Sequence, residues 1–460
     1  MPINSFLYPG AKVVTGYDVA NSLRFDDGSS DRLIKTFSTS GNQRTVTFST
    51  WFKISALGTI RHLFSNNSGD SINLASNDTL EIQLAGSAEG YLYLNRVFRD
   101  PSAWYHIVFN MDTTQSTASN RLKVYINGIQ ETSFSATSYP TQNLQTSFSE
   151  NLQHSIGSRS ANNDRFFDGY MAEVVFIDGQ SLAPDQFGEY DEDSGIWKPI
   201  DVSGLTFGTN GFYLDFENSG SLGADVSGNG NNFTVNNLTS IDQSTDTCTN
   251  NFATWNPLTT LKGNNSSLSN GNTTLIDTGT TDTDGRNYST IGASSGKWYF
   301  EIKASAFSNN NHTIGVSFSD GDVDANSNDS VRVRYTTSNN TNYIRSFGTI
   351  VQSNLTSFSA GSIIGVAVDL DNGTVQFYVN GSTYGSQVTG LSGSIANKTM
   401  FVQSYGEGGS GRTFTLDANF GNPPYTISSG NSDGNGMGNF EYSVPSGYYA
   451  LNSKNLAEYG

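Results

Sequence analysis

Carboxylates are the first chemistry to test, because two glutamates lie inside runs of apolar and aromatic residues. Hydrolysis of a glycosidic bond generally uses two carboxylates about 5–10 Å apart. On a strand, that arrangement places acidic residues two or four positions apart. The residues two positions from Glu173 are Met171 and Val175, and Glu301 likewise has no acidic residue at such a position. The spacing predicts structural roles for both glutamates and no enzymatic activity for the chain.

Histidine and cysteine form no pattern for metal or nucleophilic chemistry. Zinc sites use clustered ligands, whereas the histidines stand far apart, at His62, His106, His154 and His312. No Gly-x-x-x-x-Gly-Lys phosphate loop occurs, and Cys248 is the single cysteine. His106 lies in the middle of an apolar run and is predicted to be a packed core residue. We expect no catalytic residue and no cofactor, with calcium as the one alternative.

That alternative rests on oxygen-bearing side chains at alternating positions, namely Asp320, Asp322, Asp324 and Asn326. Ca²⁺ takes roughly six to eight oxygen ligands from such loops. An EF-hand loop would carry Gly and Glu where this chain has Ala325 and Val331. The sequence therefore favours a solvated loop and leaves a calcium site as the open alternative.

Aromatic side chains are the candidates for ligand binding. Tyrosine rings at loops or sheet edges can stack on sugar rings, while neighbouring Asn and Asp side chains supply hydrogen bonds. Most tyrosines of a β-sandwich instead fill the core or pair across strands. The tyrosines that we expect at loops or edges are Tyr91, Tyr93, Tyr335, Tyr343 and Tyr405.

The composition predicts an all-β protein. The candidate residues above must then lie on strands and turns. Of the 460 residues, 35% are hydrophobic and 14% charged, with 48 Gly and 12% aromatic residues. Apolar residues alternate with a period of two nearly throughout, and the best short helical pattern runs from Leu182 to Tyr190. The clearest hairpin spans residues 363–381, where Asn372-Gly373 is predicted to make a two-residue turn.

Charge and targeting signals narrow the class of protein further. The net charge of −18 disfavours binding to nucleic acid or to anionic membranes. No apolar run approaches the ~18 residues that a membrane span needs, and the first twelve residues lack the features of a signal peptide. A single cysteine excludes an intramolecular disulfide framework. These features favour assembly in a cytoplasm.

Composition also suggests the organisation of the chain. We predict two tandem sandwiches, with an Asn/Gly/Thr-rich connector between them that has a few strands of its own, and a docking segment at each end. The predicted segments are 1–20 as an arm, 21–200 as the first sandwich, 201–286 as the connector, 287–425 as the second sandwich and 426–460 as a tail.

Particular segments resemble known families. The first sandwich resembles laminin-G-like, concanavalin-type lectin domains through WYHIVFNMD (104–112), RLKVYING (121–128) and FFDGYMAEVVFIDGQ (166–180). The second resembles a SPRY domain through GKWYFEI (296–302), HTIGVSF (312–318) and GSIIGVAVDLDNGTVQFYVNG (361–381). Both families fold as bent jelly-roll sandwiches, so the resemblance implies a fold of two concanavalin-like jelly-roll β-sandwiches.

The pairing of these two modules resembles virion surface proteins of marine bacteriophages. That resemblance implies a non-enzymatic tail fibre or spike that binds a host cell-surface glycan or protein, located on the virion and working as a homo-oligomer with other virion proteins. The alternative is a capsid decoration protein whose modules make protein–protein contacts. Glycan binding favours the first, and placement on the capsid shell the second.

Overall fold

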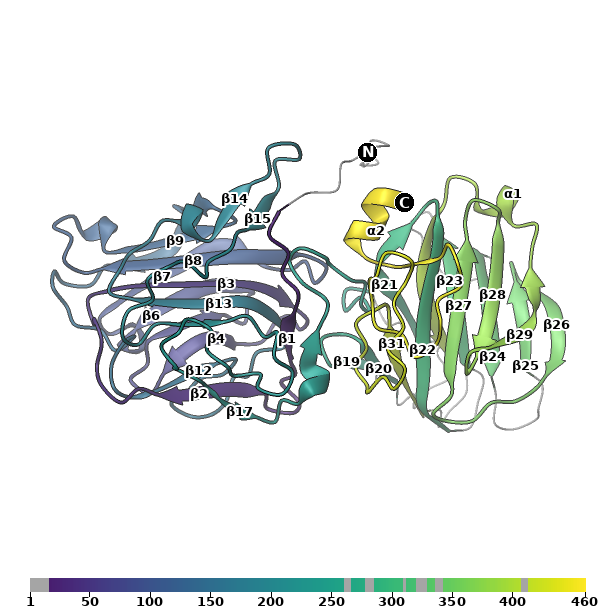
Figure 1. The fold of residues 1–460 in the computed structure, drawn as a ribbon, viewed down its shortest axis with the longest axis horizontal. Helices are drawn as coiled ribbons and strands as arrows, with labels where there is room; N and C mark the ends of the chain where they lie inside the picture. The colour runs from purple at the N-terminus through teal and green to yellow at the C-terminus, as the bar shows by residue number, and fades with distance from the viewer. Residues whose placement is uncertain are drawn as a thin grey trace. The chain divides into compact units, whose positions relative to one another are not determined.

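The computed structural model describes residues 16–259, 266–277, 285–308, 312–319, 329–335, 342–406 and 413–460. The chain divides into an N-terminal unit, Val14–Thr249, and a C-terminal unit, Asn250–Gly460 (Figure 1). Both units are built from sheets in which all strand pairs but one are antiparallel in the described residues, and the described helices are short. The prediction of an all-β chain is therefore confirmed.

The N-terminal unit is a sandwich of two large sheets with a two-stranded hairpin beside them. The first sheet has the order β10-β9-β8-β3-β13-β1-β18, with β16 also paired to β13, and the second has the order β11-β7-β6-β5-β4-β12-β2-β17. The strands are β1 Ser22–Phe25, β2 Arg32–Thr36, β3 Thr45–Ile54, β4 Arg61–Asn66, β5 Ser71–Leu74, β6 Thr79–Leu84, β7 Gly90–Val97, β8 Trp104–Asp112, β9 Leu122–Ile126, β10 Ile129–Gln130, β11 Phe134–Ser138, β12 Gln153–Ile156, β13 Gly169–Asp178, β14 Gly188–Tyr190, β15 Trp197–Pro199, β16 Phe212–Leu214, β17 Thr234–Asn236 and β18 Gln243–Ser244.

The central strands are apolar on both faces because both faces of the first sheet are covered. On the inner face, Phe48 of β3 lies opposite Phe109 of β8, and both belong to the core between the sheets. On the outer face, Val108 packs in a separate cluster with Tyr213.

The expected helix at residues 182–190 is only a 3-10 turn, Pro184–Gln186, because the chain enters β14 at Gly188.

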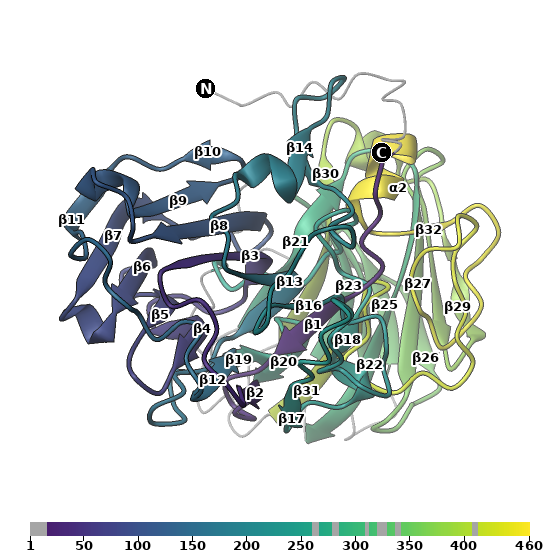
Figure 2. The same cartoon turned by 60° about the vertical axis from the view of Figure 1, so that its left-hand side comes forward.

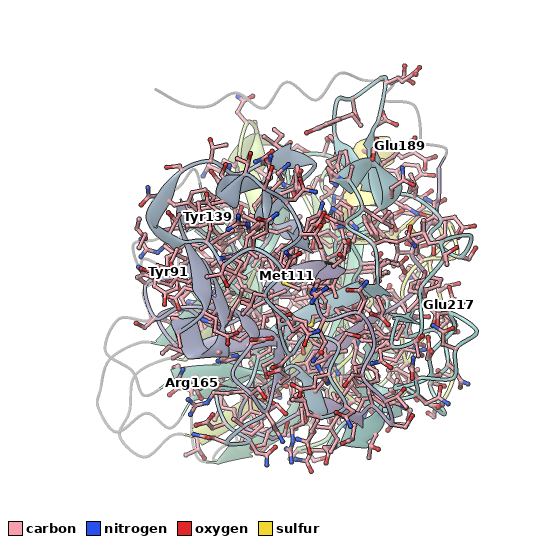
Figure 3. All side chains as sticks on the ribbon, turned by 90° about the vertical axis from the view of Figure 1, so that its left-hand side faces the viewer. Tyr91, Met111, Tyr139, Arg165, Glu189 and Glu217 are labelled. Atoms are coloured by element: carbon pink, nitrogen blue, oxygen red, sulfur yellow. The ribbon has the colours of Figure 1, made fainter. Side chains whose placement is uncertain are left out.

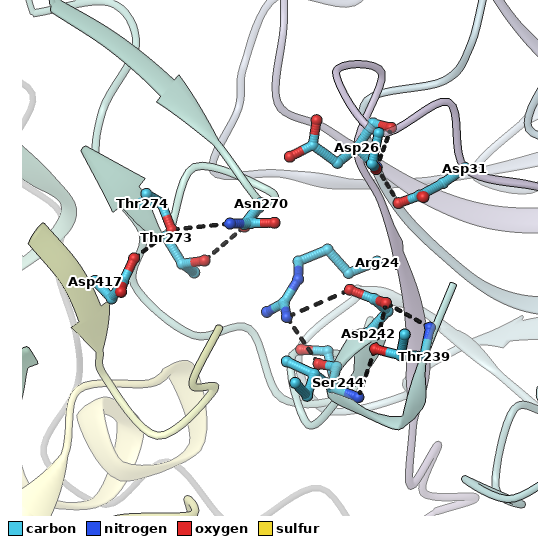
Figure 4. Close-up of polar contacts among 12 residues, drawn as sticks. Arg24, Asp26, Asp31, Thr239, Asp242, Ser244, Asn270, Thr273, Thr274 and Asp417 are labelled. Atoms are coloured by element: carbon cyan, nitrogen blue, oxygen red, sulfur yellow. Dashed lines mark hydrogen bonds and ion pairs between the residues drawn. The ribbon is translucent and has the colours of Figure 1, made fainter. Parts of the chain in front are cut away.

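The predicted connector over 201–286 is wrong as a separate segment. Its first part belongs to the N-terminal unit, where β16, β17 and β18 pair with β13, β2 and β1. The Arg24 guanidinium donates to the Ile241 carbonyl at 2.7 Å and lies 3.8 Å from the Asp242 carboxylate (Figure 4). These strands have only two or three residues, which is too short for a visible alternation.

The C-terminal unit is a second sandwich, with sheet orders β19-β20-β31-β22-β27-β28-β29 and β21-β30-β23-β24-β25-β26. The later part of the predicted connector contributes Trp255 to its core and pairs β20 with β31. Thr274 of β20 donates to Asp417 of β31 at 2.7 Å (Figure 4). The strands are β19 Ser266–Ser269, β20 Thr274–Asp277, β21 Gly285–Ala293, β22 Lys297–Ser308, β23 His312–Ser319, β24 Ser330–Tyr335, β25 Asn342–Ser346, β26 Thr349–Leu355, β27 Ile363–Asp369, β28 Thr374–Val379, β29 Ser382–Val388, β30 Thr399–Gly406, β31 Thr413–Asn419 and β32 Tyr449–Ala450.

The predicted hairpin forms from β27 and β28, with Asp369 opposite Thr374. This register leaves four residues in the turn, so the two-residue turn is a wrong prediction. Gly373 has a φ of 62°, and the Ser392 backbone comes so close that a Cβ atom would lie 2.4 Å from its nitrogen. Glycine is therefore required there for both conformation and space.

The tail is not a free docking segment. Tyr449–Ala450 forms β32, which pairs in parallel with β22, and the fully buried Leu451 joins the core. The helix α2, Ser453–Tyr459, begins after Asn452, whose side chain accepts from the Asn455 amide. At the other end, Val19 and Tyr17 pack against Trp51 of the first sheet, so the described part of the predicted arm also belongs to a unit.

Candidate functional site

The most developed candidate site is an aromatic and polar surface on the second sheet of the N-terminal unit. Burial alternates over the first five residues of β7, so Leu92 and Leu94 enter the core while Tyr91 and Tyr93 point to the opposite face. The two tyrosine rings stack with centroids 4.7 Å apart and planes inclined by 27°. Both side chains are half-buried. We call this surface, with Glu81 and Gln83 of β6, the tyrosine face.

Hydrogen bonds order the polar groups of the tyrosine face. The Gln83 amide donates to Glu81 Oε2 at 3.0 Å and lies 3.4 Å from the Tyr93 hydroxyl. Asn73 of the adjacent strand β5 also donates to Glu81 Oε2, at 3.3 Å. The arrangement offers an aromatic surface beside amide, carboxylate and hydroxyl groups, which are the groups that recognise a sugar ring.

The loop between β6 and β7 holds Tyr93 in place. Ala85, Gly86 and Ser87 have φ values of 49°, 61° and 81°, a conformation that costs free energy for the two non-glycine residues. The Ser87 hydroxyl lies 2.7 Å from the Tyr93 hydroxyl.

Asp70 links this loop to another segment of the chain. Its buried carboxylate accepts from the Ala85 amide at 2.8 Å and from the Ser147 amide at 2.7 Å. Burial raises the pKa of Asp70 to about 6, although both backbone hydrogen bonds oppose the shift. A strained backbone that a buried side chain holds in place is typical of functional loops.

A cleft of about 550 Å³ lies beside β11. There the edge of the first sheet, formed by β9 and β10, faces the edge strand β11 of the second sheet, at one end of the unit (Figure 2). The cleft is lined by Ser119, Asn120, Leu122, Lys123, Gln130, Glu131, Thr132, Phe134, Ser135, Ala136, Thr137 and Tyr139. Figure 3 shows Tyr91 and Tyr139 near the same edge of the view.

Sequence reasoning named Tyr91 and Tyr93 but missed the residues of the cleft. The usable signal was the polar stretch after the Asn127-Gly128 turn, which carries Phe134 and Tyr139 among hydroxyl residues. That stretch does not alternate in hydropathy, because it crosses from one sheet edge to the other.

The predicted tyrosines of the C-terminal unit do not form an open surface. Tyr343 on β25 and Tyr405 on β30 are only 5% and 9% exposed, so the prediction of loop or edge positions is wrong for both. The Arg332 guanidinium lies 4.5 Å from the Tyr405 ring centre, and that of Arg334 lies 4.9 Å from Tyr343. Tyr335 ends β24, and its side chain lies outside the described residues.

Glu173 is a buried acid at a β-bulge. The pairing of β13 with β3 shifts at this point, and Glu173 has a φ of 52°. The bulge breaks the expected alternation, so Met171 faces the core while Val175 faces outward. The Glu173 carboxylate accepts from the Tyr213 hydroxyl at 2.7 Å, and burial raises its pKa to about 7.

Glu301 has the same kind of environment on β22. It accepts from the backbone amides of Glu441 and Tyr442, at 2.9 and 2.8 Å, and from the Tyr299 hydroxyl at 3.1 Å. Burial raises its pKa. Each glutamate therefore binds a covering segment or side chain of its own unit, as a structural acid would.

His106, which the sequence predicted to be a core residue, packs among aromatic rings of the N-terminal unit. His106 is buried between Ser49 and Trp197, whose indole donates to Nδ1 at 3.0 Å, and it stacks on Trp51 as a core residue would. The described residues contain no group of three or more His, Cys, Asp or Glu side chains placed to hold a metal ion. The calcium candidates Asp320, Asp322, Asp324 and Asn326 lie outside the described residues, so calcium binding stays a prediction.

No helix in the described ranges is long and apolar enough to cross a bilayer.

Comparison with known proteins agrees with this architecture. Residues 27–186 match the model of the concanavalin A-like lectin/glucanases superfamily, and residues 297–405 match that of the SPRY domain. The chain therefore carries a concanavalin-like domain followed by a SPRY domain. No curated protein matches it.

Among solved structures, the SPRY domain of human HERC1 is 18% identical with a TM-score of 0.28, over 33% of this chain and 91% of that one. The TRIM65 PSpry domain is also 18% identical with a TM-score of 0.28, over 36% and 91%. A putative carbohydrate binding protein from Bacteroides ovatus is 14% identical with a TM-score of 0.35, over 48% of this chain and 59% of that one.

Proposed function

We propose that this chain is a non-enzymatic binding protein that recognises a cell-surface glycan through the tyrosine face of its concanavalin-like domain. The observation that carries the proposal is the stacked pair Tyr91 and Tyr93 beside the hydrogen-bonded Glu81 and Gln83. The strained loop that fixes Tyr93 through Ser87 adds support, because a pre-organised site loses less free energy on binding.

The absence of enzymatic activity is part of the proposal. Its support is that Glu173 and Glu301 are 5% and 0% exposed and accept hydrogen bonds from their own units. Release of reducing sugar from a bound glycan, abolished by Glu173→Gln or Glu301→Gln, would overturn it.

The test of glycan binding is a glycan array probed with the full chain, followed by calorimetry on the best ligand. Tyr91→Ala and Tyr93→Ala should each weaken binding about tenfold, the effect of losing an aromatic contact of about 1.4 kcal/mol. Tyr190→Ala is the matched control, because Tyr190 is 47% exposed on the β14–β15 hairpin. Wild-type affinity in both tyrosine-face variants, or no glycan bound at all, would overturn the proposal.

In its fuller form, we propose a phage virion surface protein of the tail fibre or spike type that attaches to a host cell. Its support is the resemblance of the module pair, together with the net charge of −18 and the single cysteine. A capsid decoration protein is the second candidate, and two observations favour it. One is the match to the SPRY domain. The other is the edge strand β26, where Ile350 and Val351 are each 47% exposed and could contact another protein. Antibody labelling of assembled particles separates tail from shell, and labelling of neither would exclude both.

A further inference from the structure

We propose that the cleft between β9–β10 and β11 binds further sugar residues of the glycan that the tyrosine face holds. The ligand is then an oligosaccharide that passes over β11, rather than a single terminal sugar. This inference rests on the proposed function, since it extends the same site.

The register of β11 connects the two surfaces. Ser138 and Ala136 of β11 lie directly opposite Tyr91 and Tyr93 of β7. Opposed residues of an antiparallel pair share a face of the sheet, so the tyrosine face continues onto β11. Ala136 is also part of the lining of the cleft. The tyrosine face and the cleft therefore adjoin at Ala136.

No large side chain separates them. From Ser135 to Ser138, β11 carries Ser-Ala-Thr-Ser, and its pairing with β7 is irregular between Phe134 and Ala136. Neighbouring strands lie only about 4.8 Å apart. A glycan chain that crosses this strand therefore meets only small side chains of β11.

The cleft has the chemistry of a carbohydrate subsite. Its volume falls within the roughly 300–1,000 Å³ that is usual for small-molecule sites. Phe134 and Tyr139 pack against the core with part of their surface exposed, and Asn120, Gln130 and Thr132 contribute amide and hydroxyl groups.

Charge in the cleft is largely balanced. Glu131 is paired with Arg96 at 2.7 Å, and the lining contains one other charged side chain, Lys123. We therefore assign the cleft to hydroxyl-rich, uncharged sugar residues.

The test measures affinity against ligand length. Calorimetry with the full chain would use the best glycan from the array as a series from its terminal disaccharide to its hexasaccharide. Wild-type affinity should rise with length. Gln130→Ala should weaken binding of the longest member about fivefold, the loss expected for one hydrogen bond of about 1 kcal/mol, and leave the disaccharide unchanged.

Two further variants complete the design. Tyr139→Ala should act in the same direction, with its melting temperature measured because Tyr139 packs against the core. Gln142→Ala is the matched control, because Gln142 is exposed and outside the lining.

Each outcome decides one of the two proposals. Affinity that is independent of length, or wild-type affinity of Gln130→Ala for the longest member, would overturn the role of the cleft while leaving the tyrosine face intact. Failure of every member to bind, or insensitivity to Tyr91→Ala and Tyr93→Ala, would overturn the proposed function itself.

Discussion

Removal of the Asp246 carboxylate should destabilise the N-terminal unit strongly. Asp246 and Lys53 form an ion pair of 2.8 Å whose side chains are 0% and 1% exposed. The Trp104 indole donates to the other carboxylate oxygen at 3.1 Å. Asp246→Ala leaves the Lys53 ammonium buried without its counter-charge, which costs about 3–5 kcal/mol. For a unit of this size, that corresponds to a fall in melting temperature of roughly 6–20 °C.

The control is an ion pair of the same unit that water can reach. Arg159 and Asp164 are 26% and 45% exposed, and exposed pairs contribute about 0–1 kcal/mol. Asp164→Ala should therefore have little effect. Replacement of both buried partners, Lys53→Met with Asp246→Leu, should cost much less than Asp246→Ala alone, because no unpaired charge remains.

Thermal unfolding and hydrogen exchange of the full chain would measure these effects, with peptides of the C-terminal unit as an internal reference. Protection should fall across β3, which carries Lys53, across β1, whose Ser22 hydroxyl donates to the Asp246 carbonyl, and across β18, which ends at Ser244. An Asp246→Ala variant within about 1 kcal/mol of the wild type would refute the reasoning.

Two other predictions concern burial at the covering segments. The pKa of Glu173, raised to about 7 by burial, lies above the ~4.3 of an unfolded chain, so the folded state binds more protons between these values. The free energy of unfolding should then fall as pH rises from about 4.3 to 7. Urea unfolding at several pH values would measure this fall, and Glu173→Gln should flatten it. The same pH dependence in Glu173→Gln and in the wild type would contradict the raised pKa of Glu173. Removal of residues 449–460 should lower the melting temperature of the C-terminal unit, because it deletes β32 and the buried Leu451; wild-type stability would show that the tail is dispensable for folding.

The sequence by itself determined the strands that bury a face. Alternating runs such as Leu122–Ile126 and Thr374–Val379 predict which of their side chains face the core, because a shift by one residue would expose the apolar side chains. The same alternation placed Tyr91 and Tyr93 together on one face, since residues two apart on a strand point the same way. For these elements, the sequence pattern alone predicts the face that the tertiary structure buries.

Only the tertiary structure decided which short segments complete the sandwiches. Residues 243–244 and 449–450 form strands because β1 and β22 offer them a hydrogen-bonding edge, and nothing in two residues encodes that. The burial of Tyr343 and Tyr405 and the break in alternation at Glu173 likewise depend on neighbours far away in sequence. The cleft exists only where the edges of two sheets meet. Its residues carry no periodic signal, because they belong to the boundary of the sandwich and not to its core.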